Sequence, residues 1–303
     1  MLKPLPLSPG SRVRVVAPAG PFEREAFEAG VVHLRARYDV VFDDGVFAKQ
    51  RYLAGDDAHR LTGLNEALGD ENCRAVFCAR GGYGAMRLLS RLNLERLPLR
   101  WLVGFSDITA LHACWQKAGR VSAHGPVVTQ LGRASEVVRE QLFSLLESTR
   151  PAAAMSGACV VPGVAEGPLI GGNLSVLTRL LGTPFAPPFE GAVLLLEDVS
   201  ERPYRLDRMW THLALAGVFQ KVRGVVLGQF MGCDEPSGEY TAHDILEGLA
   251  KASGLPCAWG FPIGHADENV AVPLGVNVRL DATAGRLSFL ESAVAPSQSI
   301  KTS

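Results

Sequence analysis

The chain has 303 residues, of which 47% are hydrophobic and 20% are charged, and its formal net charge is −1. This length and composition allow a large core in one or two domains, and they exclude an intrinsically disordered chain. Because the charge is balanced and no long basic run occurs, we do not expect nucleic acid as the main partner.

The sequence shows no signal for export, membrane insertion or metal binding. No continuous apolar segment follows Lys3, and the uncharged stretch 151–165 is too short to span a bilayer. The 6 cysteines form neither a C-x-x-C pair nor a Cys/His cluster with zinc spacing, and the 7 histidines include no H-E-x-x-H. We therefore expect a cytoplasmic protein with no membrane contact, no catalytic metal and mostly buried cysteines.

Strand and helix signals alternate along the first half of the chain. Apolar runs predict strands at 12–17, 39–42, 75–79 and 101–103. Helical periodicity follows each of them, at 23–35, 56–68, 83–89 and 108–117. Repeated βα units of this kind predict a parallel sheet with helices on both faces, in which ligands bind beyond the C-terminal ends of the strands.

A helix near 136–146 ends the first half, and the second half contains a different mixture of elements. We interpret residues 151–166, which are rich in Ala, Gly and Pro, as a linker between an N-terminal domain (1–150) and a C-terminal domain (167–303). The elements predicted after the linker are a helix from 174 to about 181, a strand at 192–196, a helix from Pro203, and short strands at 225–227 and between 270 and 290. This mixture predicts a smaller α/β domain.

The segment 103–109 has the pattern of a strand, a sharp turn and a helix. Ser106 would therefore expose its hydroxyl at a helix N-terminus, where free backbone N–H groups and the helix dipole favour negative charge. An acyl-transfer enzyme places its nucleophile at such a corner, because the oxyanion needs donors within reach. Two observations keep other interpretations open: Ser106 or Asp107 can act only as a helix cap, and Ile108 stands where the G-x-S-x-G elbow has its second glycine.

The segment Arg80–Gly84 follows a predicted buried strand and contains three glycines. Glycines at such a turn let the backbone approach a bound anion and present N–H groups to it. One interpretation is a phosphate-binding loop, although the segment matches neither G-x-G-x-x-G nor G-x-x-x-x-G-K-[ST]. A second is that Gly81 and Gly82 contribute to an oxyanion hole beside Ser106, and a third is an ordinary βα turn.

An acid and two histidines in the sequence are candidates for proton transfer. Glu197 ends the strongest predicted strand of the second half, where a carboxylate can orient a histidine or simply cap a helix. His265 lies in a loop of small and polar residues and is the best candidate for a general base, because imidazole titrates near neutral pH. His124 is its competitor, because it follows a predicted strand at 120–121 and either lines the cleft or supports it. The order Ser106, Glu197, His265 is that of α/β-hydrolases, but triads recur in every order.

Six motif regions resemble, in this order, the motifs of the serine L,D-carboxypeptidases, whose relatives include the microcin-immunity hydrolases. They are R-G-G-Y-G at 80–84, G-F-S-D-I-T at 104–109, H-G-P at 124–126, G-G-N-L-S at 171–175, L-L-E-D at 195–198 with E-R-P-Y-R-L-D-R at 201–208, and G-H-x-x-x-N at 264–269. The resemblance, which runs from about residue 13 to 280, implies a flavodoxin-like N-terminal domain and a smaller α/β C-terminal domain. It also implies a homodimer that needs no metal or cofactor and removes the terminal D-alanine from cytoplasmic murein tetrapeptides during cell-wall recycling.

The resemblance also implies catalytic roles. Ser106 corresponds to the nucleophile, Glu197 to the acid and His265 to the base. The oxyanion hole uses backbone N–H groups, which we map to Asp107 and the Gly81–Gly82 turn.

The free carboxylates of such a peptide substrate need cationic partners. Arg202 and Arg205 are candidates, because a guanidinium can bind a carboxylate through two parallel hydrogen bonds. The alternative is that both are surface charges on the first turn of a helix. His124 is a third candidate for substrate binding.

Two other functions compete with the peptidase. An immunity-type hydrolase of aminoacyl-nucleotide conjugates would use the same triad, with an aromatic side chain that stacks on the nucleobase. From Gly125 to Glu197 the only aromatic residues are Phe143, Phe185 and Phe189, which favours the peptidase. A binding protein that uses the glycine loops without catalysis would bind reversibly and would not depend on Ser106, and the intact triad counts against it.

Overall fold

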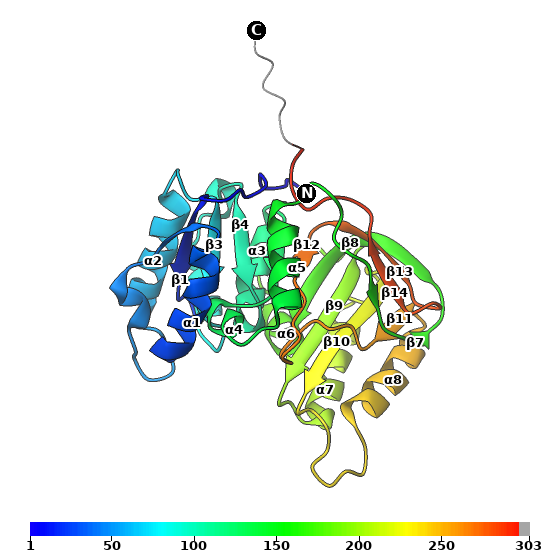
Figure 1. The fold of residues 1–303 in the computed structure, drawn as a ribbon. Coiled ribbons are helices and arrows are strands. Elements are labelled where there is room, and N and C mark those ends of the chain that lie inside the picture. Colours follow the sequence, from blue (N-terminus) through cyan, green and yellow to red (C-terminus); the bar gives the residue numbers. More distant parts are fainter. Residues whose placement is uncertain (297–303) are drawn as a thin grey trace.

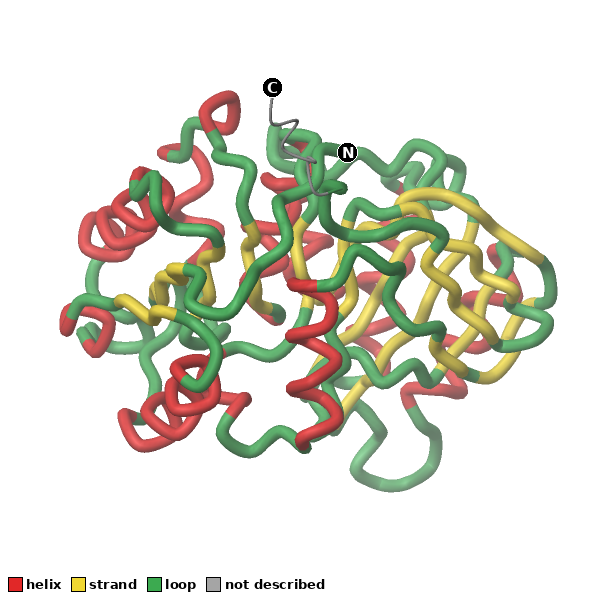
Figure 2. The backbone as a smooth tube through the Cα atoms, turned by 45° about the horizontal axis from the view of Figure 1, so that its top comes forward, coloured by secondary structure: helices red, strands yellow, loops and turns green. Residues whose placement is uncertain are grey.

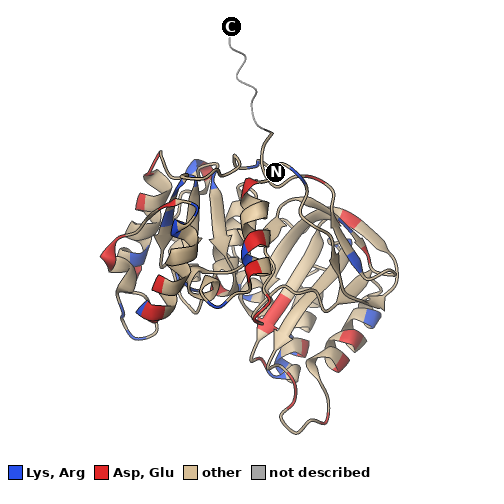
Figure 3. Cartoon of the chain, in the orientation of Figure 1, with Lys and Arg blue, Asp and Glu red and all other residues tan. Residues whose placement is uncertain are grey.

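The structure is a computed structural model that describes residues 1–296. Its strands form two sheets, which lie side by side in Figure 1 and are seen as two groups of strands with helices around them in Figure 2. Charged residues of both signs are interspersed over both halves, as Figure 3 shows. Within residues 1–296, no helix is both long enough and apolar enough to cross a membrane.

The first sheet has the strand order β12-β5-β4-β3-β1-β2. Its strands are β1 (Arg12–Val16), β2 (Asp39–Val41), β3 (Ala75–Cys78), β4 (Trp101–Gly104), β5 (Ser122–His124) and β12 (Val272–Leu274). The first five are parallel and follow the order 2-1-3-4-5, which is the flavodoxin-like order, so the predicted fold class is confirmed. β12 comes from the second half of the chain and pairs antiparallel with β5.

Helices cover both faces of this sheet, because successive side chains of its strands point to opposite sides. The helical segments are α1 (Arg24–Arg35), α2 (Asp57–Gly69), α3 (Thr109–Lys117), α4 (Val128–Leu131) and α5 (Glu136–Glu147), and the 3-10 helices η1 (Asp44–Phe47), η2 (Ala85–Arg91), η3 (Leu94–Arg96) and η4 (Ser106–Ile108). On one face Phe77 of β3 packs with residues of α1, α4 and α5. On the other face its neighbour Val76 packs with residues of α2, η2 and α3.

The second sheet has eight strands in the order β6-β14-β13-β8-β9-β10-β11-β7. Its central strands β8 (Val164–Asn173), β9 (Val193–Val199), β10 (Gly224–Met231) and β11 (Cys257–Trp259) are parallel, and β13 (Asn277–Asp281) and β14 (Arg286–Phe289) are antiparallel neighbours. The helices α6 (Leu174–Leu180), α7 (Pro203–Leu215) and α8 (Ala242–Ser253) contribute apolar side chains to one core of this sheet. A second core joins β8, β9 and β10 to β12, so it connects the two sheets.

The segment 151–166 is not an extended linker. It forms β6 (Met155–Ser156), which pairs with β14, then β7 (Ala158–Val161), which pairs with β11, and the beginning of β8. These strands take up backbone groups that would otherwise be free at the two edges of the sheet. The second sheet therefore has more strands than the first. The sheets also do not follow the predicted division into 1–150, 151–166 and 167–303, because β12 lies in the second half of the chain but pairs in the first sheet.

Two helical elements also differ from the prediction. The helix predicted from Tyr83 is the 3-10 helix η2, which begins at Ala85 because Gly84 has a φ of 128° that no helix contains. Helix α8 is not among the predicted elements, although Thr241 and Asp244 form a capping box at its start.

Candidate active site

Ser106 lies at a sharp corner between a strand and a helix. β4 ends at Gly104, and Ser106 begins the single 3-10 turn that leads directly into α3. The φ of Ser106 is 64°, in the left-handed region that a non-glycine residue rarely adopts, at a cost of about 1–3 kcal/mol. Strain of this kind is typical of a turn that exposes a nucleophile.

The structure brings Ser106, His265 and Glu197 together in one hydrogen-bonded line. His265 Nε2 lies 3.1 Å from Ser106 Oγ, and His265 Nδ1 lies 2.7 Å from Glu197 Oε2. Glu197 stands on β9 with no exposed surface, whereas His265 stands in the loop that follows β11. With a ring proton on Nδ1 donated to Glu197, Nε2 is free to accept the proton of the serine hydroxyl.

The three residues come from different halves, so the contacts between the halves determine their distances. His265 and Ser106 are 159 residues apart in the chain. Two of these contacts lie near the site. Val272 of β12 pairs with His124 of β5, and the Asn173 N–H donates over 2.9 Å to Oγ1 of Thr109, the residue that begins α3 directly after the serine turn.

The glycine turn predicted as an oxyanion-hole contributor lies against Ser106. A Cβ placed on Gly81 would be 2.9 Å from Ser106 Oγ, and Gly82 has a φ of 107°. The Gly20 N–H donates to the Gly81 carbonyl over 3.0 Å, which fixes the turn to the loop after β1. The turn is therefore close enough to the hydroxyl for its backbone to contact an oxyanion that develops beside Ser106.

The side chain of Asp107 ties the serine corner to the same turn. Its Oδ2 accepts a hydrogen bond from the backbone N–H of Ala85 over 2.7 Å, at the start of η2. Burial raises the pKa of Asp107, and the hydrogen bond from Ala85 opposes that rise. Asp107 is therefore more than a helix cap, because its carboxylate connects two loops that border the site.

A second buried carboxylate, Asp198, follows Glu197 directly. It accepts hydrogen bonds from Asn173 Nδ2 at 3.0 Å and from the Ser175 N–H at 2.8 Å, which hold the junction of β8 and α6. Burial, and next the charge of Glu197, raise the pKa of Asp198 to about 6.

His124 has no exposed surface, and neither of its ring nitrogens has a hydrogen-bond partner among the described residues. Burial, with smaller effects from His112 and His265, lowers the pKa of His124 well below its usual value, so the ring is neutral. Its centroid lies 6.0 Å from that of Phe105, whose ring lies 4.7 Å from His265. This position favours the alternative that His124 supports the site rather than touches the substrate.

Arg202 and Arg205 lie at the beginning of α7 and each pairs with a carboxylate at the surface. Arg202 Nη1 is 3.2 Å from Glu235 Oε1, and Arg205 Nη1 is 3.4 Å from Glu201 Oε2. Both side chains are about half exposed, so such pairs contribute little to stability.

Two amide side chains that the sequence analysis does not single out hold the loop of His265. The Gly264 N–H donates to Asn269 Oδ1 over 3.0 Å, and the Ala266 N–H donates to Gln229 Oε1 over 3.0 Å. Asn269 lies in the quoted motif G-H-x-x-x-N, which was a signal for its importance, but nothing in the sequence points to Gln229.

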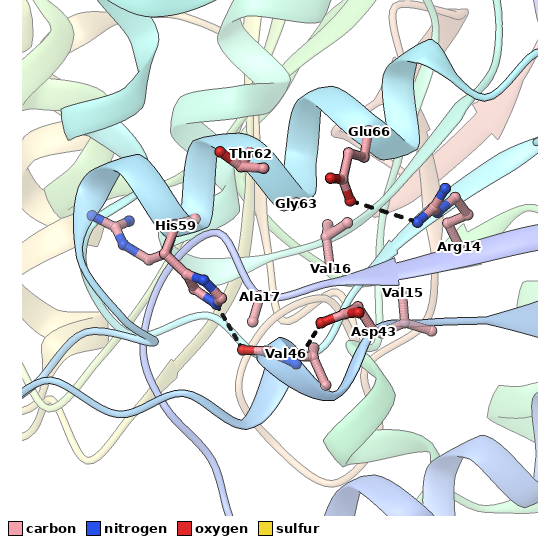
Figure 4. A pocket seen from close by; sticks show the side chains of 12 residues that line it. Arg14, Val15, Val16, Ala17, Asp43, Val46, His59, Thr62, Gly63 and Glu66 are labelled. Atoms are coloured by element: carbon pink, nitrogen blue, oxygen red, sulfur yellow. Dashed lines mark hydrogen bonds and ion pairs between the residues drawn. The ribbon is translucent and has the colours of Figure 1, made fainter.

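A separate cavity of about 210 Å³ lies between α2 and β1 (Figure 4). None of the predicted site residues lines it. Several of its polar side chains have partners of their own, as in the contact of His59 Nε2 with the Gly45 carbonyl at 2.7 Å and the pair of Arg14 with Glu66 (Figure 4).

Two family descriptions match this chain. Residues 13–125 match "LD-carboxypeptidase N-terminal domain", and residues 166–280 match "LD-carboxypeptidase C-terminal domain". A putative carboxypeptidase of Synechocystis sp. is 39% identical over 294 residues, which cover 95% of this chain and 97% of the relative. The murein tetrapeptide carboxypeptidase of Pseudomonas aeruginosa is 34% identical over 287 residues, which cover 89% and 93%.

Solved structures show the same fold. A muramoyltetrapeptide carboxypeptidase from Oxalobacter formigenes has a TM-score of 0.82 and 28% identity, with 91% of this chain and 97% of that chain covered. MccF in complex with glutamyl sulfamoyl guanosine has a TM-score of 0.89 and 22% identity, with 97% and 100% covered, a likeness of fold alone. The sequence matches span both halves and nearly the full length of the relatives, and they show that this chain belongs to the LD-carboxypeptidase family of serine-type carboxypeptidases.

Proposed function

We propose that this enzyme removes the terminal D-alanine from murein tetrapeptides, with Ser106 as nucleophile, His265 as general base and Glu197 as the acid that orients His265. The observation that carries the proposal is the hydrogen-bonded line from Ser106 Oγ through His265 to Glu197, at 3.1 and 2.7 Å. The relative from Pseudomonas aeruginosa is named a murein tetrapeptide carboxypeptidase, which supports the choice of substrate.

In the first step His265 Nε2 takes the proton of Ser106 as Oγ forms a bond to the scissile carbonyl carbon. Glu197 keeps the ring in the required tautomer and stabilises the imidazolium that forms. When the tetrahedral intermediate collapses, the C–N bond breaks and His265 gives its proton to the amino group of the leaving D-alanine.

The oxyanion of that intermediate needs hydrogen-bond donors that are already in place. We assign this role to the backbone N–H groups of Asp107 and of the Gly81–Gly82 turn, which borders Ser106. Each such donor is worth roughly 3–4 kcal/mol of transition-state stabilisation in comparable enzymes.

In the second step a water molecule resolves the acyl-enzyme. His265 takes a proton from the water as its oxygen attacks the ester carbon, and the Ser106 oxygen leaves with the proton that His265 returns. Arg202 and Arg205 are the proposed partners for the free carboxylates of the peptide.

Cytoplasmic location and a homodimeric state belong to the same proposal. Cell fractionation and light scattering of the purified protein test them.

The central test is incubation of the purified protein with L-Ala-D-Glu-meso-diaminopimelate-D-Ala and detection of free D-alanine by mass spectrometry. We expect release by the wild type and a loss of at least about 10³-fold in Ser106→Ala. The exposed serine at position 90 offers a matched control, since Ser90→Ala should keep full activity. Equal release by wild type and Ser106→Ala would contradict the role of Ser106.

Hydrolysis of aminoacyl-nucleotide conjugates by the same three residues is a second candidate. One observation favours it: Tyr52 and Tyr83 are 57% and 51% exposed, with ring centroids 5.6 Å apart, and Tyr83 follows the glycine turn that borders Ser106. Exposed aromatic rings can stack on a nucleobase. Cleavage of such a conjugate, with no release of D-alanine from the murein peptide, would favour this candidate.

A further inference from the structure

We infer that Asn269 and Gln130 are positioning residues, which hold His265 in register with Ser106 across the two halves of the molecule. The inference rests on the roles proposed for Ser106 and His265. It adds a contact that keeps Ser106 Oγ and His265 Nε2 3.1 Å apart, although the two residues follow strands of different sheets.

Asn269 makes two contacts with its side-chain amide and is almost completely buried, at 1% exposure. Its Oδ1 accepts the N–H of Gly264, the residue directly before His265, over 3.0 Å. Its Nδ2 donates to Gln130 Oε1 over 3.2 Å. One side chain therefore closes the loop that carries the base and connects this loop to the first half of the chain.

Gln130 is 7% exposed and stands on the short helix α4. Another residue of α4 connects this helix to the turn beside the nucleophile. The Thr129 N–H donates to the carbonyl of Ala79 over 3.1 Å, and Ala79 stands two residues before Gly81. Gly81 in turn contacts the side chain of Ser106. A continuous path of hydrogen bonds and packing thus runs from the backbone next to His265 to the glycine turn beside Ser106.

Gln229 holds the same loop in a different way. Its Oε1 accepts the Ala266 N–H at 3.0 Å and its Nε2 donates to the Glu268 carbonyl at 3.1 Å, but it stands on β10 of the second sheet. Gln229 therefore shapes the loop within its own half, whereas the contact between Asn269 and Gln130 crosses between the halves. This difference offers a matched comparison of two glutamines.

The test compares Gln130→Met with Gln229→Met, each of which removes an amide at nearly constant volume. A displacement of about 1 Å between catalytic groups costs up to about 10²-fold in rate, so we expect Gln130→Met to lower kcat by 10- to 100-fold and to leave KM nearly unchanged. The loss in Gln229→Met should be clearly smaller. Asn269→Ala should lose at least as much as Gln130→Met, because it removes the contact with Gln130 and also the acceptor of the Gly264 N–H. The double variant should lose no more than Asn269→Ala, because the contact with Gln130 is already absent there.

A second readout does not depend on the identity of the substrate. An alkyl fluorophosphonate forms a bond between its phosphorus and Ser106 Oγ, fluoride leaves, and His265 takes the hydroxyl proton. The labelling rate of Ser106, followed by mass spectrometry, should fall in Gln130→Met in parallel with kcat. If the wild type is labelled but releases no D-alanine, the murein substrate is wrong and this readout still tests the positioning role.

Gln116→Met controls for the loss of a buried glutamine in general, because Gln116 is 2% exposed and its amide has no partner among the described residues. It should keep its activity. Kinetics are interpreted only for variants whose Tm shows that they fold, and Asn269→Ala carries the test if Gln130→Met does not. The inference is overturned if a folded Gln130→Met keeps kcat and labelling within 2-fold of wild type, or if Gln229→Met loses as much.

Discussion

Gly81 and Ser106 are in such close contact that a Cβ on residue 81 would lie 2.7 Å from Ser106 Cβ and 2.9 Å from Oγ. Real Cβ atoms do not approach so closely, so Gly81→Ala must move either the turn or the serine. We expect a loss of about 10²-fold in kcat, because small displacements at a reacting centre have effects of that size. Steady-state kinetics check this, with Gly63→Ala, where a Cβ meets nothing within 4 Å, as the control.

Glu197→Gln should leave the fold intact and lower kcat by roughly 10⁴-fold, because an amide can hold the imidazole in the wrong tautomer and cannot stabilise its cation. KM should change little. The measurement is D-alanine release at saturating peptide, with far-UV circular dichroism to verify folding. Activity within 10-fold of wild type would remove Glu197 from the mechanism.

His124→Leu tests whether His124 touches the substrate or supports the site. Neither ring nitrogen has a partner among residues 1–296, so an apolar side chain should cost no stability at pH 7, and kcat/KM should stay within about 3-fold. If the substitution instead weakens peptide binding, so that KM rises by an order of magnitude or more, His124 belongs to the substrate-binding residues.

The same variant should show a different dependence of stability on pH. The folded-state pKa of His124 lies below its ordinary value of 6.5, so below pH 6.5 the unfolded chain binds a proton that the folded protein does not. The stability of the wild type should therefore fall relative to His124→Leu between pH 7 and 5. Urea unfolding at both pH values measures the difference, and a constant difference would contradict the buried neutral ring.

Asp198 should have the opposite pH dependence. Its pKa is raised from 3.8 to about 6 in the folded protein, so the folded state holds a proton that the unfolded chain has lost. The free energy of unfolding of the wild type should decrease relative to Asp198→Asn as the pH rises from 4 to 7, by up to about 3 kcal/mol. Parallel urea titrations of the two proteins measure this difference in the free energy of unfolding, and a difference that increases or stays constant would contradict the raised pKa of Asp198.

Arg202→Ala and Arg205→Ala separate the two arginine candidates. Loss of the one that binds a substrate carboxylate should raise KM by about 10- to 100-fold with little change in kcat, since a charged hydrogen bond is worth about 1.5–3 kcal/mol. Arg279, which pairs with Glu166 at the surface, is a matched control. If both variants bind the peptide as well as Arg279→Ala does, the two residues are surface charges.

Local patterns were sufficient for β1 to β4, whereas the strand predicted at 120–121 is β5 at 122–124. The run at 75–79 is apolar throughout because β3 is buried on both faces. The helix predicted at 56–68 is α2, at whose start Asp56 accepts the His59 N–H over 2.7 Å. Residues 151–166 could not be assigned in this way, because their strands depend on pairing with β11 and β14, more than 90 residues later in the chain.

The candidate site could likewise be predicted only in part from local patterns. The corner at Ser106 and the identities of Glu197 and His265 follow from motifs, but motifs do not contain distances. The reach of the Asp107 carboxylate to Ala85 and the contact of Asn269 with Gln130 depend on how the halves dock, and no local pattern of residues encodes that.

The pairing of β12 with β5 also has a consequence for synthesis on the ribosome. The edge of β5 stays open until Leu274 has left the exit tunnel, so the nascent first half exposes unpaired strand groups next to the nucleophile. A chain that stops after the first half would lack its covering strand and would be prone to associate with its own copies. The active site is therefore completed late in synthesis, when β12 pairs with β5 and the loop before β12 places His265 beside Ser106.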